Sequence, residues 1–264
     1  MPEFTSHPAG TPCWVDLMSP DVDASKMFYS GLFGWDADDQ YDDDNNRVYV
    51  MFSLDGKAVA GLGDQPPEVG PMPAVWSTYV ATDDCDATAA AVVAAGGSIM
   101  MAPMQVMAAG HMAIFVDPTG AVISVWKAGE HTGAEICNEP NTWSWNELTT
   151  SDVQGAKTFY SAAFGWSYEE MDMGEGGTYN VIAGGDHGGL GGIMARMPEM
   201  PAEVPDCWTV YFTVSDAEAT LARVAELGGA IVQPVFPIEG VGFAAMAADP
   251  HGGVIGLMQP AAPQ

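Results

Sequence analysis

Two acidic side chains each lie close to an indole in strand-like stretches of this sequence. Asp16 follows Trp14 by two residues, and Glu147 follows Trp145 by two residues. Residues two apart in an extended chain share one face, so each carboxyl group is expected beside an aromatic ring. A carboxylate in a partly dry pocket has a raised pKa and can act as a general acid or base. The pattern predicts that Asp16 and Glu147 are catalytic groups that transfer a proton.

The same two carboxylates also have a purely structural interpretation. Each can accept hydrogen bonds from backbone amides or from tyrosine hydroxyls and so shape the fold without reacting. Carboxyl groups with perturbed pKa values occur in structural networks as well as in active sites. Both interpretations stay open at the level of sequence.

The two carboxylates occupy matching positions in a duplicated chain. The segment from Trp14 to Trp35 recurs from Trp145 to Trp166, with eleven of 22 positions identical. A second set of matches is offset by 132 residues, namely Trp76/Trp208, Tyr79/Tyr211, Gly96-Gly97/Gly228-Gly229 and Asp117-Pro118/Asp249-Pro250. Similarity at a fixed period indicates a tandem repeat of about 130 residues. We expect domains at 1–128 and 142–264 with a polar linker at 129–141, and therefore a pair of related sites.

Each half contains the same shorter pattern twice. Residues 13–19 alternate as a strand, Asp21 and Asp23 open a helix, and Gly34 ends it. A second alternating strand at 77–82 leads to an alanine-rich helix that stops at Gly96-Gly97. Further strand-like runs follow the two helices, at 48–54, 58–62, 111–116 and 121–126. The pattern predicts an α+β fold in which a strand, a helix and three strands occur four times.

The composition limits the partners and the cellular location that we expect for the protein. The chain has 264 residues with 7 Lys and Arg against 35 Asp and Glu, which gives a net charge of −28. Such a surface repels nucleic-acid phosphates and anionic membranes. The four cysteines show no CxxC spacing, and no apolar run reaches membrane-spanning length. The first residues, MPEFTSHPAG, lack a basic segment and an apolar run, so we expect no signal peptide. We expect a cytoplasmic monomer or homodimer that binds a small molecule.

Specific motifs connect this pattern to a known superfamily. Each half contains D-x-x-x-(A/S)-K-x-F-Y and then (L/A)-F-G-W, followed by a Gly-Gly helix stop and a D-P-x-G turn. These motifs resemble the vicinal oxygen chelate superfamily of glyoxalase I, bleomycin-resistance proteins and extradiol dioxygenases. The phrases TPCWVDL and NTWSWNEL resemble its two-domain actinobacterial glyoxalase-like group, which carries hydroxylase labels. The resemblance covers about residues 11–259, and it implies paired βαβββ modules whose curved sheets enclose a cavity in each half.

The resemblance also implies where metal ligands would stand. Members that use a metal have His and Glu at set positions on the cavity face. The matching positions here are Trp14 and Trp145, Ser77 and Thr209, Ser124 and Gly256, and the neighbourhoods of Ala60-Gly61 and Gly191-Gly192. None of these residues offers the imidazole or carboxylate that a catalytic divalent ion requires. The sequence therefore predicts a site with no metal and no cofactor.

Aromatic and hydroxyl side chains complete the predicted ligand site. The alternation of the strands places four rings on the cavity face, where they can stack on a flat ligand. Ser77, Thr209 and His111 are expected to add polar contacts. The predicted ligand-binding residues are thus Trp14, Trp145, Tyr79, Tyr211, Ser77, Thr209 and His111. The alternative is that the rings fill the cavity as core and that His111, next to Gly110, is exposed at the start of its strand.

The predicted function is the binding of a small apolar, aromatic or carbonyl-containing organic molecule without a metal. Proton transfer by Asp16 or Glu147 would serve detoxification or secondary metabolism. One alternative is a binding protein that sequesters an antibiotic or metabolite without turnover, as in the bleomycin-resistance branch. A weaker alternative is a metal-dependent glyoxalase or dioxygenase with Asp16, Glu147 or His111 as shifted ligands.

Overall fold

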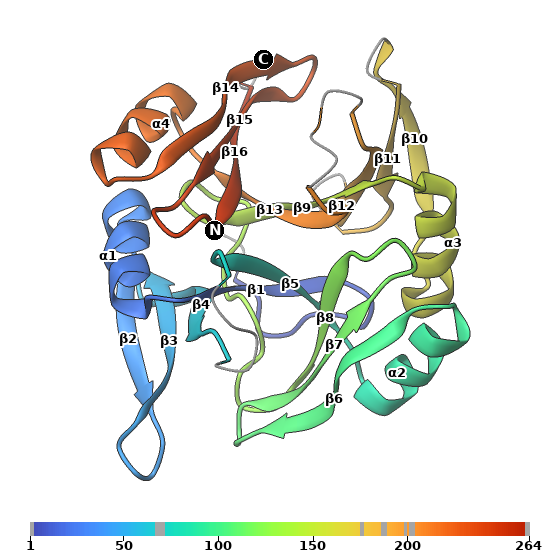
Figure 1. Ribbon diagram of the computed structural model, residues 1–264, viewed down its shortest axis with the longest axis horizontal. Helices are drawn as coiled ribbons and strands as arrows, with labels where there is room; N and C mark the ends of the chain where they lie inside the picture. The colour runs from blue at the N-terminus through green and yellow to red at the C-terminus, as the bar shows by residue number, and fades with distance from the viewer. Residues whose placement is uncertain are drawn as a thin grey trace.

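The computed structural model contains two eight-stranded sheets, one from each half of the chain (Figure 1). It describes residues 3–66, 72–174, 177–185, 189–197, 200 and 204–261. The first half contains β1 (Pro12–Ser19), α1 (Val22–Phe33), β2 (Asp36–Tyr41), β3 (Arg47–Leu54), β4 (Lys57–Asp64), β5 (Val75–Ala81), α2 (Cys85–Ala94), β6 (Ser98–Val106), β7 (Gly110–Val116) and β8 (Val122–Ala128). The second half contains β9 (Trp143–Thr150), α3 (Val153–Phe164), β10 (Tyr168–Asp172), β11 (Thr178–Ile182), β12 (Gly191–Ala195), β13 (Cys207–Thr213), α4 (Ala217–Glu226), β14 (Ala230–Ile238), β15 (Gly242–Ala248) and β16 (Val254–Pro260).

Both sheets have the same mixed topology, which confirms the α+β prediction and the fourfold strand–helix–strands pattern. The strand order is β2-β3-β4-β1-β5-β8-β7-β6 in the first sheet and β10-β11-β12-β9-β13-β16-β15-β14 in the second. The leading strand of each module pairs in parallel with the last strand of that module, as β1 does with β4 and β5 with β8. The two modules of a half join through an antiparallel pair, β1 with β5 and β9 with β13. Neither sheet closes into a barrel.

The helix signals of the sequence have the expected physical basis. The Asp21 carboxylate accepts a hydrogen bond from the Ala24 amide, and Asp152 does the same for Gly155 at the start of α3. Gly34 ends α1 with φ 75° and Gly165 ends α3 with φ 73°. This left-handed conformation favours glycine and closes the helix. The repeated motif therefore fixes the length and direction of the first helix in each half.

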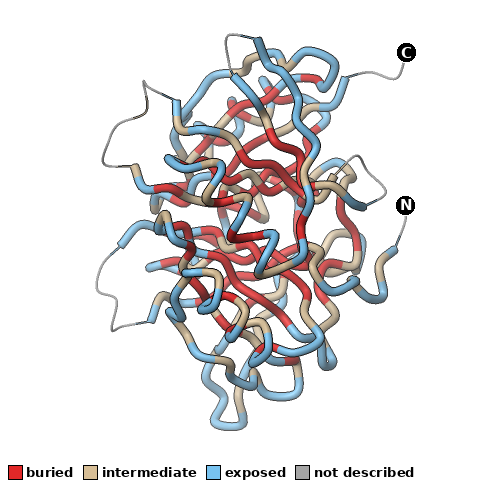
Figure 2. The backbone as a smooth tube through the Cα atoms, turned by 90° about the vertical axis from the view of Figure 1, so that its right-hand side faces the viewer, coloured by how far each residue is buried: buried red, intermediate tan, exposed pale blue. Residues whose placement is uncertain are grey.

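The two halves share their hydrophobic cores. Phe28 and Phe33 of α1 pack in one cluster with Phe212 of β13 and Leu221 of α4. The other cluster joins the second and third modules through α2 and α3. Figure 1 shows α1 beside α4 and α2 beside α3, and Figure 2 shows buried segments running through both sheets while exposed segments lie at the rims. Each half thus covers its apolar face with the other half.

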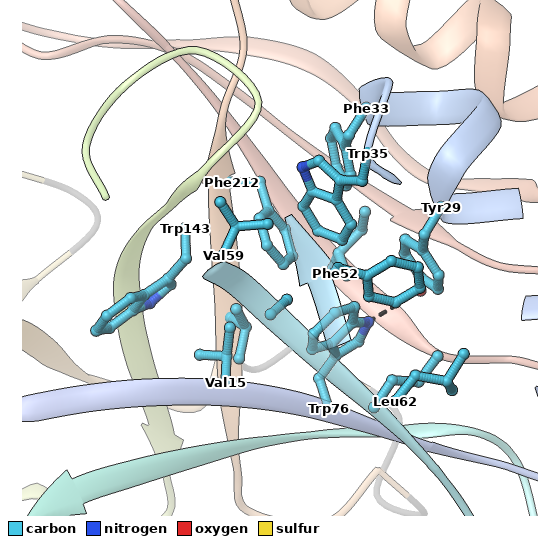
Figure 3. Close-up of a cluster of buried hydrophobic side chains, with 14 of the residues drawn as sticks. Val15, Tyr29, Phe33, Trp35, Phe52, Val59, Leu62, Trp76, Trp143 and Phe212 are labelled. Carbon is cyan, nitrogen blue, oxygen red and sulfur yellow. Dashed lines mark hydrogen bonds between the residues drawn. The ribbon is translucent and has the colours of Figure 1, made fainter. Parts of the chain in front are cut away.

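Two equivalent sets of hydrogen bonds connect the two halves. The Tyr29 hydroxyl donates to Asp249 Oδ2 of the other half over 3.0 Å. Trp76 Nε1 donates to the Tyr29 hydroxyl over 2.9 Å, as Figure 3 shows. The mirror set joins Tyr160 to Asp117 Oδ2 over 2.9 Å and Trp208 Nε1 to Tyr160 over 2.8 Å. The aspartates come from the two D-P-x-G turns, and the tyrosines from the F-Y pairs of α1 and α3.

Among the described residues, none of the helices combines the length and apolar character needed to cross a membrane.

Removing the Tyr29 hydroxyl is expected to destabilise both halves of the folded protein together. Tyr29→Phe leaves Asp249 Oδ2 and Trp76 Nε1 buried without their partner, which costs about 1 to 3 kcal/mol per orphaned group. Tyr160→Phe should give a similar loss, because its environment is the mirror image. Urea unfolding measures both changes. Tyr41→Phe is the control, since that ring is 54% exposed, and a loss in Tyr29→Phe no larger than in the control would contradict the prediction.

Candidate functional site

A buried carboxylate bonded to two tyrosines lies at the centre of the first sheet. The hydroxyls of Tyr49 on β3 and Tyr79 on β5 both donate to Asp16 Oδ2 over 3.0 Å. Trp14 Nε1 donates to the Tyr49 hydroxyl over 3.1 Å. Asp16 is 4% exposed. We call these four residues the first carboxylate cluster.

The second sheet contains the equivalent second carboxylate cluster. The Tyr179 hydroxyl of β11 donates to Glu147 Oε2 over 2.8 Å, and the Tyr211 hydroxyl of β13 donates to Glu147 Oε1 over 2.9 Å. Trp145 Nε1 donates to the Tyr179 hydroxyl over 2.9 Å. The order indole, phenol, carboxylate, phenol is therefore the same in both halves.

Glycines on the neighbouring strands make room for the phenols. Gly61 of β4 lies opposite Asp16 in the register, and a Cβ on Gly61 would collide with the Tyr49 hydroxyl. Gly192 of β12 lies opposite Glu147 and is covered in the same way by Tyr179. The Tyr49 hydroxyl thus occupies the space of a side chain at Gly61, and the Tyr179 hydroxyl occupies the space of a side chain at Gly192.

Burial changes the acidity of the whole cluster. It raises the pKa of Asp16 from its ordinary value of 3.8 to about 6, although hydrogen bonds from Tyr49, Tyr79 and Ser77 oppose the rise. Burial also raises the pKa of Glu147, against hydrogen bonds from Tyr179 and Tyr211. A carboxyl group whose pKa lies close to neutrality can both accept and return a proton.

The two clusters differ in how fully their polar atoms are paired. Both tyrosines of the first cluster donate to the same oxygen of Asp16, and its Oδ1 has no hydrogen-bond partner. In the second cluster each oxygen of Glu147 accepts one tyrosine hydroxyl. The first carboxylate therefore has one buried oxygen free to accept a proton.

The structure brings most of the predicted residues together. Trp14, Trp145, Tyr79 and Tyr211 belong to the two clusters, where the tyrosines act as hydrogen-bond donors to the carboxylates. Ser77 faces Asp16 across the β1–β5 pair, and Thr209 faces Glu147 across the β9–β13 pair.

His111 lies elsewhere, which corrects its predicted place in the cavity. By strand alternation it shares a face of β7 with Ala113 and Phe115, and these two residues belong to the same buried cluster as Val92 of α2. The exposed His111 therefore lies on the helix-bearing face of the sheet, in a surface hollow of about 240 Å³ with Cys85 and Lys127.

A second surface hollow of about 180 Å³ lies between the N-terminal segment and β8, where His7, Cys13 and Trp126 line it. Neither hollow includes a residue of the carboxylate clusters.

Sequence reasoning missed Tyr49 and Tyr179. Each joins its carboxylate from two strands away, and no local motif marks it. Their offset of 130 residues, close to that of Trp14 and Trp145, is the signal that could have identified them.

The residues of the clusters do not suit a divalent metal ion. The space beside each carboxylate is taken by two phenols and an indole, and the adjacent positions are Gly61, Gly192 and hydroxyl residues. Within the described ranges, no three His, Cys, Asp or Glu side chains gather as metal ligands would.

Paired βαβββ modules in two open mixed sheets define a tandem two-domain protein of the glyoxalase fold. The model of the Glyoxalase/Bleomycin resistance protein/Dioxygenase superfamily matches residues 12–125 and 143–257, so the chain belongs to this superfamily.

Three similar proteins illustrate the range of this superfamily. CFP32 of Mycobacterium tuberculosis, which carries a provisional glyoxylase name, is 41% identical over 100% of both chains. The anthracycline biosynthesis protein DnrV of Streptomyces peucetius is 40% identical over 86% of each chain. The Mn(II)-bound glyoxalase of Novosphingobium aromaticivorans has a TM-score of 0.66, with 17% identity over 95% of this chain and 82% of its own. The last similarity is one of fold alone.

The raised pKa of Asp16 predicts a specific pH dependence of stability. Below about pH 4 the carboxyl is protonated in both states, and its contribution to the free energy of unfolding is fully present. As the pH rises through about 6, the folded state must ionise a buried group, and about 3 kcal/mol of that contribution is lost. Asp16→Asn removes the titration, so its stability relative to the parent protein should increase by about that amount between pH 4 and pH 7. Urea unfolding at both pH values measures the difference, and parallel curves would contradict the assignment.

Proposed function

We propose that this protein binds a small, flat aromatic molecule with a carbonyl group and moves a proton on it with a carboxylate of the clusters. The observation that carries the proposal is the buried carboxylate held between two phenols beside an indole, with its pKa raised toward neutrality. An acid or base in such surroundings is suited to proton transfer at neutral pH. The indole supplies an apolar surface for stacking.

The relatives favour an aromatic ketone as the ligand. DnrV and DauV are named for anthracycline biosynthesis, and both are about 40% identical to this chain over most of its length. Anthracyclines are polycyclic aromatic compounds with ketone and hydroxyl groups. A ligand of this class presents a flat ring system to Trp14 or Trp145 and polar groups to the neighbouring carboxylate.

The proposed chemistry needs no change of oxidation state. The carboxylate removes a proton from a carbon next to the ligand carbonyl, or from a hydroxyl conjugated with it, and the electron pair moves to the carbonyl oxygen. The proton then returns from the carboxyl group to a second position of the same molecule. The net result is an isomerisation, in which the protein is unchanged.

Metal independence is the first testable consequence. The chain purified without chelators should contain less than stoichiometric manganese, zinc, nickel or iron, because the positions beside the carboxylates offer phenols, indoles and glycines. Elemental analysis measures the content, and ligand binding before and after EDTA treatment measures the requirement. About one tightly bound ion per chain, with binding lost on its removal, would refute metal independence.

Aromatic binding is the second testable consequence, with alizarin, a dihydroxyanthraquinone, as the probe. Bound alizarin should quench tryptophan fluorescence. Replacing the indole of the occupied cluster, by Trp14→Ala or Trp145→Ala, should weaken binding by about 1 to 3 kcal/mol through lost stacking and burial. If both indoles only fill the core, each change would lower stability by about 3 to 5 kcal/mol without a specific effect on binding. Fluorescence titration and thermal melting of each variant separate the two results.

A further inference from the structure

The first half contains two buried polar atoms without a hydrogen bond of normal geometry, although Ser77 lies near enough to Asp16, and Ser124 near enough to Tyr79, to lower the pKa of each of these two groups. Asp16 Oδ1 and Ser124 Oγ both lack a hydrogen-bond partner, although Asp16 is only 4% exposed and Ser124 only 1% exposed. A buried polar atom without a partner costs stability, and such atoms are rare in folded proteins. Two of them on the same sheet need a physical explanation, and a bound ligand supplies one.

These atoms belong to the same region of the sheet. Trp14, Tyr79 and Ser124 lie opposite one another in a row across β1, β5 and β8. Side chains that are directly opposite in neighbouring strands point to the same face. Asp16 lies two residues from Trp14 on that face, and the Tyr79 hydroxyl reaches it. Both unsatisfied atoms therefore lie on the face that carries the first carboxylate cluster.

A third unsatisfied atom comes from the segment between the halves. The ring of His131 packs edge-on against Trp14, with 4.4 Å between the ring centroids. Its Nε2 is buried without a partner, while its backbone oxygen accepts a hydrogen bond from Trp126 Nε1 over 2.9 Å. Burial lowers the pKa of His131 to about 4, so the ring is neutral at pH 7 and can donate one hydrogen bond and accept another.

The second half also has buried polar atoms without a partner, namely Trp143 Nε1, Asn146 Nδ2 and His251 Nε2, but none of them belongs to the second carboxylate cluster. Both oxygens of Glu147 are paired, and Gly256 stands where the first half has Ser124. The Tyr211 ring fills the space of a side chain at Gly256. Trp145 faces the backbone of Gly189, whose added Cβ would lie 2.9 Å from the indole Cη2. Trp145, Glu147 and Tyr179 are also partly exposed, unlike Trp14 and Asp16.

We propose that the first half alone holds the reacting site, with Asp16 Oδ1 as the atom that accepts the proton and Ser124 Oγ and His131 Nε2 as hydrogen-bonding groups for the ligand. The second carboxylate cluster then holds its own sheet together. This inference rests on the proposed function, and it narrows the ligand to a hydroxylated aromatic ketone. The ligand hydroxyl or acidic C–H faces Asp16, and the carbonyl oxygen, where negative charge develops, accepts from Ser124 or His131.

Alizarin binding to the whole chain tests which half is occupied. Calorimetry should give one alizarin per chain. Asp16→Asn and Ser124→Ala should each weaken binding at least about tenfold, as expected for loss of a buried hydrogen bond to the ligand, and His131→Phe should weaken it several-fold while keeping an aromatic contact with Trp14. Glu147→Gln is the matched variant of the second half, and its effect on affinity should be at least about tenfold smaller than that of Asp16→Asn. Two alizarin molecules per chain, or a larger loss in Glu147→Gln, would overturn the assignment to the first half.

Melting without a ligand gives an independent readout. In Asp16→Asn the amide oxygen can accept both tyrosine hydroxyls, and the amide NH₂ takes the place of the unpartnered Oδ1. In Glu147→Gln the NH₂ replaces an oxygen that accepts a tyrosine hydroxyl. We expect Asp16→Asn to melt at or above the temperature of the parent protein at pH 7, and Glu147→Gln to melt about 2 to 6 °C lower. The reverse order would overturn the structural role of the second cluster.

The binding experiment and the melting experiment together distinguish failure of this inference from failure of the proposed function. If the parent protein does not bind alizarin but the melting order is as expected, the aromatic ligand is wrong and the division between the halves is supported. If alizarin binds and Glu147→Gln abolishes binding, the ligand class stands and the division is wrong. If alizarin binds and neither Asp16→Asn nor Ser124→Ala weakens it, the assigned atoms are wrong.

Discussion

The structure depends on the burial of each half against the other. A single βαβββ pair leaves one face of its sheet apolar, and here that face is covered by the opposite half. Val15 and Leu17 of β1 pack in the same cluster as Val210 and Phe212 of β13. The Tyr29–Asp249 and Tyr160–Asp117 hydrogen bonds connect the two halves at both contacts. Because an unpaired buried carboxylate costs free energy, these bonds favour one relative position of the halves.

This packing determines where a site can lie. Val15 and Leu17 of β1 are committed to the shared core, and Trp14 and Tyr79 of the first carboxylate cluster are buried against the same core, so the first cluster is packed on both sides. The carboxylates lie on central strands, β1 and β9, whose other side is fixed by the core. Phenols from β3 and β5, or from β11 and β13, reach them from both sides. The clusters are therefore held by the most constrained strands of the molecule, which suits groups that must keep their geometry.

The sequence revealed the fold more fully than the site. The sequence shows the duplication, the helix starts at Asp21 and Asp152 and the glycines that end the helices as local patterns. The structure contains each of these features. The two carboxylates were also visible, because each stands on an alternating strand. Tyr49 was not visible, because its contact with Asp16 depends on the pairing of β3 with β4 and of β4 with β1. His111 was misplaced because alternation gives two faces and does not say which one α2 covers. Asp249 reaches Tyr29 across 220 residues of sequence, and no local pattern predicts such a bond.

The difference between the two clusters follows from the cost of unsatisfied polar atoms. Glu147 is one methylene longer than Asp16, and its two oxygens reach separate tyrosines. Asp16 is shorter, its tyrosines meet on one oxygen, and the other oxygen is left without a partner. Pairing both oxygens reduces the cost of burying a carboxylate, whereas a half-paired one keeps more of that cost and gains when a ligand supplies the missing bond. Since each half completes the core of the other, the second half must fold even if only the first half reacts, and a satisfied cluster meets that requirement. The same arrangement of indole, phenols and carboxylate can thus hold a sheet in one copy and bind a substrate in the other.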